Sequence, residues 1–333
     1  MKSVAIKAGV STSTVSHVIN KTRFVSTDKK ERVFKAIKEL DYQPNGLARN
    51  FRKKRTKTIG LIIPDNTNPY FAEVARGVED ACFELGYSVI LCNSDRKMEK
   101  EINYLELLME KGVDGIAFVS VGDDKKATDI FGKKRVPKVL LDREIPGLQL
   151  DSVLVDNQLG GFLATEYLIK LGHRRIACIT GPSKLSSSME RETGYYNALK
   201  KSNIIPDKIL IQSGSFHSDS GYEAIKNLLL KSNPPTAIFA CNDLIAIGAM
   251  FGANEMGFKV PNDLSIIGFD DISIASFMAP RLTTVMQPKY DIGKTAANLL
   301  IKRIINRDLP VKLEIFKPVL TIRGSCMAYK NRT

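Results

Sequence analysis

The sequence predicts an α/β protein in which an N-terminal helix-turn-helix headpiece precedes a larger, two-lobed body with parallel sheets. Three observations lead to this prediction. A helix-turn-helix pattern and a dense cluster of positive charge both lie within the first 57 of the 333 residues. From Thr58 onward, short apolar runs alternate with longer helical stretches, as in a parallel sheet with crossover helices. This alternation occurs in two successive series, so we expect two similar lobes.

The composition is that of a globular protein that is too long for one ordinary domain. Hydrophobic residues make up 44% of the chain, yet no apolar run approaches the roughly 18 residues of a membrane span. The N-terminus has no apolar signal segment, so we expect a cytoplasmic protein without a membrane partner. We expect no cofactor, no metal site and reduced thiols, because the candidate ligands are scattered. These candidates are Cys82, Cys92, Cys178, Cys241, Cys326, His17, His173 and His217.

The net charge of +13 is concentrated in the headpiece. Residues 1–57 contain 15 Lys and Arg against 4 Asp and Glu, a net of +11, which leaves 34 against 32, a net of +2, for the rest. Such a block is typical of a nucleic-acid-binding module. A merely soluble basic domain would explain the charge but not the helix-turn-helix pattern beside it. A membrane-surface helix would need bulky apolar anchors, which this segment lacks.

Residues 11–20 are predicted to form the helix that meets DNA. Val15, Val18 and Ile19 mark one apolar side, and Ser11 suits the N-cap because its hydroxyl can accept from an unpaired backbone N–H. A short helical run that ends at Gly9 precedes this helix and completes the helix-turn-helix pattern. The polar side consists of Thr12, Ser13, Ser16, His17 and Asn20. These short side chains would let the helix approach base edges, although an ordinary surface helix is an alternative for this segment alone.

A third helix is predicted over residues 27–40, and a hinge segment follows it. The apolar face of the third helix is predicted to consist of Val33, Phe34, Ile37 and Leu40. Pro44 interrupts the pattern, and residues 45–51 suit two further helical turns. Gly46 destabilises these turns by about 1 kcal/mol relative to Ala. We therefore expect the hinge segment, about residues 44–53, to become helical only on DNA.

The body, residues 58–333, shows two series of strands and helices. The first series of predicted buried strands is TIGLIIP, YSVILCN, GIAFVS, KVLLD and SVLVD, and the second is RIACITG, TAIFAC and LSIIGFD. The predicted helices are residues 70–85, 98–111, 158–171, 188–201 and 243–256. Ligands of such folds bind beyond the carboxyl ends of the strands. The polar side chains at these ends are therefore candidates for a binding site.

Several polar residues occupy such strand ends. They include residues 65–71 and Asp142, Arg143, Asn242, Asp243, Asp270, Asp271 and Gln287. Structural alternatives are a helix cap for Asp243, a solvated turn for Asp271 and a purely structural ion pair between Asp142 and Arg143. Together these residues supply carboxylates, amides, a guanidinium and aromatic rings, which suit the hydroxyls and apolar ring faces of a sugar.

Two stretches, VAIKAGVSTSTVSHVIN and AIKELDYQPNGLARNFR, resemble the headpiece of the LacI/GalR family of bacterial transcription regulators. The resemblance implies a helix in the major groove and a hinge helix in the minor groove of a palindromic operator in double-stranded DNA. It implies base contacts for Thr12, Ser13 and His17, and positioning contacts for Ser11, Thr14, Ser16 and Asn20. In the hinge segment it implies DNA contacts for Asn45, Ala48, Phe51 and Arg52. Phe51 would be the apolar wedge, where the family usually has Leu.

Five stretches of the body resemble the effector domain of the same family, whose fold is that of periplasmic sugar-binding proteins: NTNPYFAEVARGVEDACFELGYSVILCN, LGHRRIACITGP, NDLIAIGAM, VPNDLSIIGFDDI and LTTVMQPKYDIG. The implied lobes are about residues 58–156 with 287–317, and 157–286 with 318–333. The pocket resembles that of ribose-binding members, so the implied effector is D-ribose. Its implied contacts are Asn68, Tyr70, Phe71, Asp142, Arg143, Arg191, Phe216, Asn242, Asp270 and Gln287. Tyr70 is a variation whose hydroxyl needs a partner.

The resemblance also implies how such a protein works. We expect a homodimer whose two headpieces read the two halves of the operator, with residues 70–85 contributing to the dimer contact. Ribose between the lobes would close each subunit, separate the hinge segments and release the operator. We see no heptad tail after Arg323 that would join two dimers. Family members have a few more residues before the first helix, so we expect the natural start to lie upstream of Met1.

Three other functions are alternatives. An enzyme is disfavoured because the IGKT at residues 292–295 resembles the end of a phosphate-binding loop, but Pro288 replaces a required glycine and the stretch reads as helix. A sugar-binding transport protein would not explain the basic headpiece. A regulator could instead answer to another sugar, a phosphorylated sugar, a purine or a phosphorylated coregulator protein. The pair of Asp142 and Arg143 favours a polyol over a purine.

Overall fold

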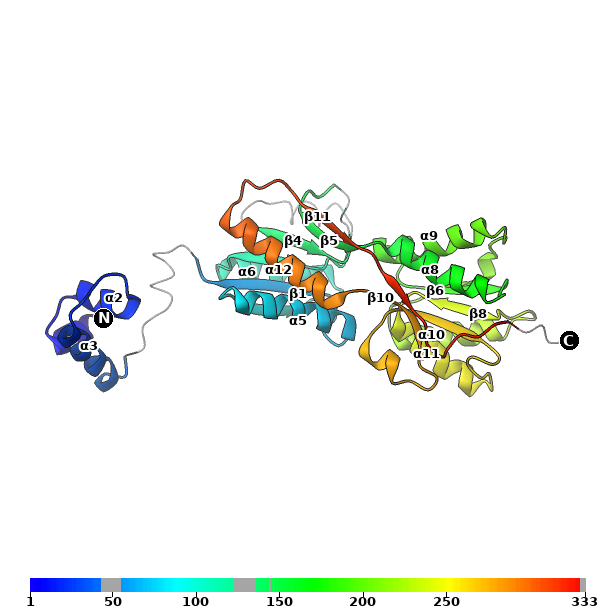
Figure 1. The fold of residues 1–333 in the computed structure, drawn as a ribbon, viewed down its shortest axis with the longest axis horizontal. Coiled ribbons are helices and arrows are strands. Elements are labelled where there is room, and N and C mark those ends of the chain that lie inside the picture. Colours follow the sequence, from blue (N-terminus) through cyan, green and yellow to red (C-terminus); the bar gives the residue numbers. More distant parts are fainter. Residues whose placement is uncertain (43–54, 123–135, 144, 146, 330–333) are drawn as a thin grey trace. The chain divides into compact units, whose positions relative to one another are not determined.

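The computed structural model describes residues 1–42, 55–122, 136–143, 145 and 147–329. The chain divides into two compact units, Met1–Thr56 and Lys57–Thr333. Figure 1 shows the first unit in dark blue and the second in the remaining colours. Within the described residues, no helix is long and apolar enough to cross a membrane.

Three short helices form the first unit: α1 (Lys2–Ala8), α2 (Thr12–Asn20) and α3 (Thr27–Glu39). α1 ends at Gly9, whose φ of 61° lies in the left-handed region that favours glycine. α2 begins after Ser11, whose hydroxyl accepts a hydrogen bond from the backbone N–H of Thr14. The shared core consists of Val4, Ala5, Ala8, Val15, Val18, Val25, Val33 and Ala36. The predicted helix-turn-helix is therefore confirmed.

The predicted core face of α3 is wrong at two positions. Phe34 is 54% exposed and Leu40 is 39% exposed, whereas Val33 and Ala36 are buried and Ile37 packs against the core. Phe34 follows Val33 by one residue, so its side chain points about 100° away around the helix. Leu40 lies beyond the last residue of α3. The core stripe therefore has the i, i+3, i+4 spacing of an amphipathic helix, with the small Ala36 at its centre.

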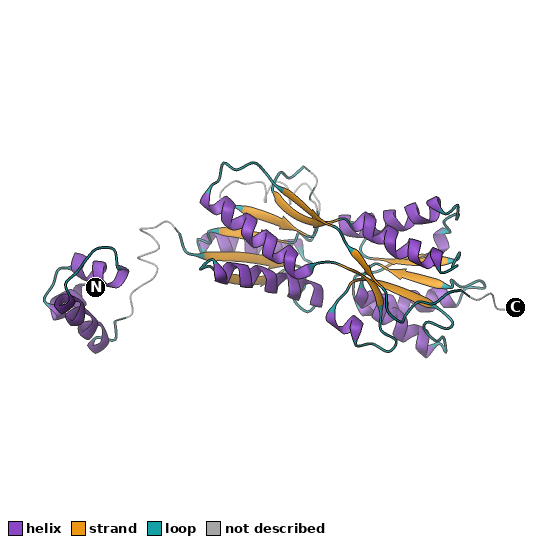
Figure 2. Ribbon diagram, viewed as in Figure 1, coloured by secondary structure: helices purple, strands orange, loops and turns teal. Residues whose placement is uncertain are grey.

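The first lobe of the second unit contains a six-stranded sheet with the order β11-β5-β4-β3-β1-β2, all parallel. Its strands are β1 (Thr58–Ile63), β2 (Ser88–Asn93), β3 (Gly115–Phe118), β4 (Lys138–Leu141), β5 (Asp151–Val155) and β11 (Leu313–Phe316). Helices α5 (Pro69–Glu84) and α12 (Lys289–Ile305) cover one face, and α6 (Met98–Glu110) covers the other (Figure 2). The side chains alternate accordingly, since Leu61 packs with α5 and α12 while Ile62 packs with α6.

The second lobe contains another six-stranded sheet, with the order β12-β10-β9-β8-β6-β7. Its strands are β6 (Ile176–Thr180), β7 (Ile211–Ser213), β8 (Ala237–Ala240), β9 (Ser265–Asp270), β10 (Thr283–Met286) and β12 (Val319–Thr321). Its helices are α8 (Asn157–Lys170), α9 (Ser186–Lys201), α10 (Ser218–Leu229) and α11 (Asp243–Glu255), with 3₁₀ turns at Lys208–Leu210 and Ser273–Ser276. α8 packs beside α9, and α10 packs beside α11 (Figure 1). The predicted α/β fold is therefore confirmed.

The chain crosses between the two lobes three times. The first crossing leads from β5 to α8 near Asp156, and the second leads from β10 to α12 near Gln287. The third leads from β11 to β12 through residues 317–318, and these two consecutive strands form the long red segment in Figure 1. Each lobe is therefore built from segments that lie far apart in the sequence.

The structure differs from the predicted strand pattern in two ways. β12 is antiparallel to β10, so the second sheet is not wholly parallel. β2 is an edge strand rather than a buried one, and Ile90 and Leu91 are 40% and 47% exposed. Four strands, β7, β10, β11 and β12, were not predicted, because none of them contains an apolar run longer than two residues. The predicted helices agree with α5, α6, α8, α9 and α11 within one or two residues at each end.

Close contact between helices depends on paired glycines. A Cβ atom at Gly194 in α9 would lie 2.1 Å from the carbonyl oxygen of Gln158 in α8. A Cβ atom at Gly161 in α8 would likewise lie 2.1 Å from the carbonyl oxygen of Arg191. The two backbones therefore approach as closely as they do only because neither residue has a side chain. This packing fixes the start of α9, and with it Arg191, against the rest of the second lobe.

Candidate functional site

The exposed side of α2 is small and polar and carries no Lys, Arg, Asp or Glu. Thr12 and Ser13 are exposed, whereas Thr14, Ser16, His17 and Asn20 are half-buried. The Asn20 amide donates to the backbone oxygen of Ser16 at 2.9 Å and to its hydroxyl at 3.2 Å. His17 Nδ1 lies 2.8 Å from the hydroxyl of Thr22, a residue just beyond the end of the helix, and this contact orients the imidazole ring. The structure therefore places all seven predicted residues of this segment on or beside one helix.

Arg32 of α3 holds the turn between the first two helices. Its guanidinium donates to the backbone oxygen of Ala8 at 3.0 and 2.6 Å and to that of Gly9 at 3.0 Å. It also forms an ion pair with Asp28 at 3.5 Å. These bonds satisfy carbonyl groups at the end of α1, which have no partner inside the helix. The orientation of α2 therefore depends on a side chain from the third helix.

The predicted hinge contacts Asn45, Ala48, Phe51 and Arg52 lie outside the described residues. Their roles stay predictions.

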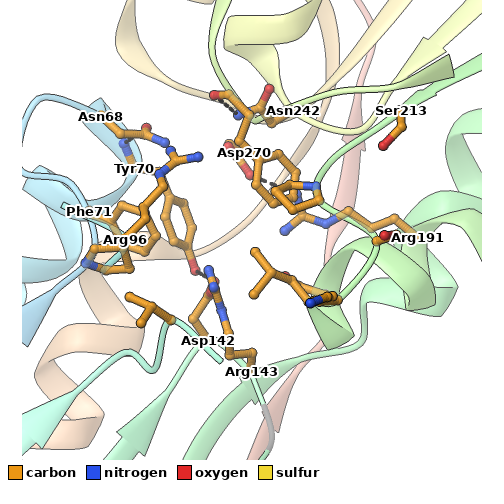
Figure 3. A pocket seen from close by; sticks show the side chains of 18 residues that line it. Asn68, Tyr70, Phe71, Arg96, Asp142, Arg143, Arg191, Ser213, Asn242 and Asp270 are labelled. Atoms are coloured by element: carbon orange, nitrogen blue, oxygen red, sulfur yellow. Dashed lines mark hydrogen bonds and ion pairs between the residues drawn. The ribbon is translucent and has the colours of Figure 1, made fainter. Parts of the chain in front are cut away.

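A cavity of about 410 Å³ lies between the two lobes and is lined by both. Nine of the ten predicted effector contacts line it: Asn68, Tyr70, Phe71, Asp142, Arg143, Arg191, Phe216, Asn242 and Asp270. Figure 3 shows the residues of the first lobe, such as Tyr70 and Asp142, across the cavity from Arg191 and Asp270 of the second. The tenth, Gln287, stands behind the lining, where its amide donates to Asp270 at 2.7 Å. The structure therefore brings the predicted set together at one cavity.

The carboxyl ends of the strands supply most of this lining, as expected for a parallel sheet. Asp142 follows β4 directly, Asn242 follows β8 at a distance of two residues, and Asp270 ends β9. Asn68 and Asn242 cap α5 and α11, because their side-chain oxygens accept from the backbone N–H groups of Tyr70 and Ile245. Both caps therefore hold a helix start at the rim of the cavity.

Two structural alternatives for strand-end aspartates are wrong. Asn242, not Asp243, caps α11, and Asp243 is buried, where it accepts from the hydroxyl of Thr284 and the backbone N–H of Ile272. Burial raises the pKa of Asp243 well above its usual value. Asp271 is not a solvated turn, because Arg323 forms an ion pair with it at 2.7 Å. Neither aspartate lines the cavity, so both support the site from behind.

Asp142 is the centre of a buried network in the first lobe. The Tyr70 hydroxyl donates to one of its oxygens at 2.6 Å, which is the partner that this hydroxyl needs. The Arg143 guanidinium donates to the other oxygen at 3.1 Å from Nε and 2.9 Å from Nη2. Burial and the nearby charge of Asp142 raise the pKa of Tyr70 well above its usual value, so Tyr70 is a stable donor. The carboxylate therefore faces the cavity with a fixed orientation.

Asp270 is the corresponding carboxylate of the second lobe. It accepts from Gln287, and Arg191 Nη1 lies 3.6 Å from it. Burial raises the pKa of Asp270 to about 6, although the charge of Arg191 and the hydrogen bond from Gln287 oppose this rise. Arg191 is itself held by the side-chain oxygen of Asn157 at 2.8 Å and the backbone oxygen of Cys241 at 2.6 Å. Two carboxylates, each beside a guanidinium, thus face one cavity from opposite lobes.

Three lining residues adopt a left-handed backbone conformation. The φ angles of Asp142, Phe216 and Asp270 are 71°, 64° and 108°. Each such conformation in a residue other than glycine costs roughly 1–3 kcal/mol and persists only where the surroundings fix it. Such strain is typical of binding sites, because the unusual backbone conformation directs the side chain into the site. The ring of Phe216 packs against Gly181, because a Cβ atom added to Gly181 would lie 2.2 Å from that ring.

Part of the lining was not predicted from the sequence. The missed polar residues are Arg96, Ser183, Lys184, Ser187 and Ser213. Arg96 follows β2, Ser183 and Lys184 follow β6, and Ser213 ends β7. The same rule of polar residues at strand ends would have identified these four if it had been applied to every strand.

Arg96 also links the two lobes. Its guanidinium lies 3.5 Å from Asp65 of the first lobe and donates to the backbone oxygen of Ser215 of the second. Burial alone would raise the pKa of Asp65, but hydrogen bonds from Thr67 and the charges of Arg96 and His217 outweigh it and lower the pKa. Asp65 is therefore a stable anion that holds Arg96 across the mouth of the cavity.

Two family models match the chain. One is described as the lacI family of bacterial regulatory proteins and matches residues 1–45. The other is described as periplasmic binding proteins and the sugar-binding domain of the LacI family, and it matches residues 56–321.

Curated relatives match along nearly the whole chain. The ribose operon repressor of Escherichia coli strain K12 is 43% identical over 327 residues, which cover 98% of this chain and 99% of that protein. The HTH-type transcriptional repressor PurR of Vibrio atlanticus strain LGP32 is 41% identical over 326 residues, which cover 98% of each.

Solved structures are also similar. A LacI family transcriptional regulator from Enterococcus faecium with bound ribose has a TM-score of 0.76 at 32% identity and covers 82% of this chain and 100% of that chain. A lac repressor dimer bound to operator and the anti-inducer ONPF has a TM-score of 0.88 at 28% identity and covers 98% of both chains.

Proposed function

The chain belongs to the LacI family of bacterial transcriptional repressors, and from that premise we propose that it represses a ribose-utilisation operon and leaves its operator when ribose binds between the lobes. One observation carries the sugar response: Asp142 and Asp270 face the same cavity from opposite lobes, each buried and each beside an arginine. Each carboxylate oxygen has more than one lone pair and can accept a further hydrogen bond from a ligand hydroxyl, and a polyol offers adjacent hydroxyls on several sides.

The rest of the lining suits a sugar ring. The rings of Phe71 and Phe216 are buried and supply apolar plates, while Asn68 and Asn242 supply amide groups. Ribose is favoured among sugars because a curated relative is named as a ribose operon repressor and a similar structure contains ribose. A purine is the second candidate, since a relative of nearly equal identity is named PurR. Two buried carboxylates favour the polyol.

The operator contacts are proposed from the geometry of α2. Thr12, Ser13 and His17 would read base edges in the major groove, while Ser11, Thr14, Ser16 and Asn20 would position the helix on the phosphates. The hinge residues would enter the minor groove. The net charge of +11 in residues 1–57 would supply the salt-dependent part of the affinity.

A homodimer is proposed because apolar side chains are exposed on both lobes of the second unit. On the first lobe Phe83 is 81% exposed, and Ile90 and Leu91 lie nearby in chain order on the edge strand β2. On the second lobe Phe251 is 59% exposed and Phe277 is 82% exposed. Pairing with a second copy of the chain would remove such side chains from water. A two-fold dimer would read a palindromic operator.

The proposed release of DNA follows from binding across the lobes. A ligand that contacts Asp142 and Asp270 at once favours the arrangement in which both lobes touch it. It can shift the equilibrium only by its difference in affinity for the closed and open arrangements. Closure would move the two hinge segments of the dimer apart and weaken their hold on the minor groove.

The test is a thermal-shift panel on the full chain with D-ribose, D-xylose, D-glucose and hypoxanthine. A ligand at 100 times its dissociation constant stabilises the folded state by about 2.7 kcal/mol. We expect a shift with D-ribose that Arg191→Ala abolishes, and no shift with hypoxanthine. A rise in melting temperature with hypoxanthine alone would indicate that the effector is a purine rather than a sugar. Release is then measured by fluorescence anisotropy on a palindrome selected from randomised DNA, with and without D-ribose.

A further inference from the structure

The N-terminus of α9 opens into the cavity with donors that have no partner. We propose that this end of the cavity is a phosphate subsite, so that the effector is a phosphorylated monosaccharide. The proposal rests on the proposed sugar response of the same cleft and adds the chemical class of the ligand. Its residues are Ser183, Lys184, Ser187 and the first turn of α9.

The helix start is suited to an anion. α9 spans Ser186–Lys201, 16 residues, and its N-cap Leu185 offers no side-chain acceptor. No acidic residue lies in the first turn. Among the described residues, no acceptor is bonded to the backbone N–H groups of Ser186 and Ser187. Such unsatisfied N–H groups and the partial positive charge of a helix N-terminus form a ready site for phosphate.

Ser187 is a second, independent indication of a ligand. Its side chain lines the cavity although the residue is only 1% exposed. No described residue forms a hydrogen bond with its hydroxyl. Because this hydroxyl faces the cavity and has no partner in the described part of the chain, a ligand oxygen can form a hydrogen bond with it.

The charges of the lining also leave a cation without a partner. The lining contains four cationic side chains, Arg96, Arg143, Lys184 and Arg191, and two carboxylates, Asp142 and Asp270. Arg143 pairs with Asp142, Arg191 lies near Asp270, and Arg96 pairs with Asp65 behind the lining.

Lys184 is the cation that remains, since it has no ion pair or hydrogen bond with any described residue. Its charge of +1 and roughly +0.5 from the helix N-terminus make about +1.5. A phosphate monoester carries about −1.5 to −2 at neutral pH. A neutral sugar makes no use of this charge, whereas a sugar phosphate matches it.

The two parts of the ligand then have separate partners. The hydroxyls would face Asp142 and Asp270, and the phosphate would face the first turn of α9. Arg191 lies on the same helix one turn further on, and glycine contacts fix that helix to α8. The distance between the phosphate and hydroxyl partners is therefore set by a rigid element.

The experiment is isothermal titration of the full chain with D-ribose and with D-ribose 5-phosphate. The variants are Lys184→Gln and Ser187→Ala, and the matched control is Lys200→Gln, an exposed lysine at the other end of α9. We expect the phosphate ester to bind at least tenfold more tightly than D-ribose, a difference of about 1.4 kcal/mol. Lys184→Gln should remove this advantage and leave the affinity for D-ribose within twofold. Lys200→Gln should change neither affinity.

Two results would overturn the proposal in different ways. Equal affinities for the two ligands, or an equal loss of both in Lys184→Gln, would eliminate the subsite but leave a sugar-responsive cleft. If neither ligand binds, the proposed sugar response itself fails, and the subsite fails with it. Because Lys184 is exposed, its replacement should leave the melting temperature unchanged, and Ser187→Ala gives an independent reading of the same subsite.

Discussion

Asp270→Asn should make the unliganded protein more stable at neutral pH while it weakens effector binding. Asp270 is 4% exposed, and burial raises its pKa to about 6 from 3.8. A carboxyl group with a raised pKa in the folded state is easier to ionise in the unfolded chain. Ionisation therefore favours unfolding, and the folded protein loses stability as the pH rises from about 4 to about 6.

The magnitude follows from the difference in pKa between the two states. A difference of about 2 pH units, at about 1.4 kcal/mol per unit, corresponds to about 3 kcal/mol above pH 6. Asn has nearly the same shape, stays neutral and keeps an oxygen that can accept from Gln287. We expect Asp270→Asn to recover up to about 3 kcal/mol at pH 7.5 and almost nothing at pH 4.

The assay is urea denaturation followed by circular dichroism at several pH values between 4 and 8, because the chain has no tryptophan to report unfolding by fluorescence. The control is Asp271→Asn, which removes an ion pair with Arg323 and should not increase stability at any pH. Equal stability of Asp270→Asn and the parent protein at pH 7.5 would refute the reasoning. So would a gain that does not depend on pH.

Three further predictions concern packing, lobe closure and the headpiece. Gly194→Ala places a methyl group 2.1 Å from a carbonyl oxygen of α8 and should lower the free energy of unfolding by about 1 kcal/mol or more. Gly324→Ala is the control, because no atom lies nearer than 3.6 Å to the added methyl group, and it should not lower that free energy. Thermal denaturation compares the two variants. Arg96→Ala removes the link between the lobes and should weaken binding of D-ribose by roughly fivefold or more in titration calorimetry, if each lost charged hydrogen bond is worth at least about 1 kcal/mol. Arg32→Ala frees the turn before α2 and should reduce affinity for the selected operator more than for random DNA, as measured by fluorescence anisotropy at one fixed salt concentration.

The part of the site that could be predicted from the sequence follows from strand direction. Asp142 and Asp270 are far apart along the chain, but parallel strands end at the same edge of a sheet, and two such edges face each other here. Residue types and strand positions were therefore enough to select seven of the lining residues, whereas Arg191 and Phe216 were predicted only from the family resemblance. The same rule, applied to all strands, would also have selected Arg96 and Lys184.

The rest depends on geometry that no local pattern contains. Arg96 reaches the second lobe because Asp95 and Arg96 both adopt left-handed conformations, with φ of 51° and 57°. Phe34 is apolar but lies on the exposed side of α3, because the helix packs against the core with the smaller Ala36. The short strand β10 pairs with β9 on one side and with β12 on the other, and these pairings between distant segments, rather than a strong apolar pattern, define it as a strand.

The three crossings between the lobes determine when the protein can fold during synthesis. The first lobe lacks α12 and the edge strand β11 until residues 289–316 have been made, and the second lobe lacks β12 until residue 321. A nascent chain that ends at residue 286 therefore carries two unfinished sheets, with the apolar face that α12 covers still open to water. The headpiece, in contrast, is complete within the first 42 residues. Translation thus delivers the three-helix core of the headpiece long before the lobes are complete, and a chain that ends at residue 286 carries two incomplete lobes rather than one whole lobe.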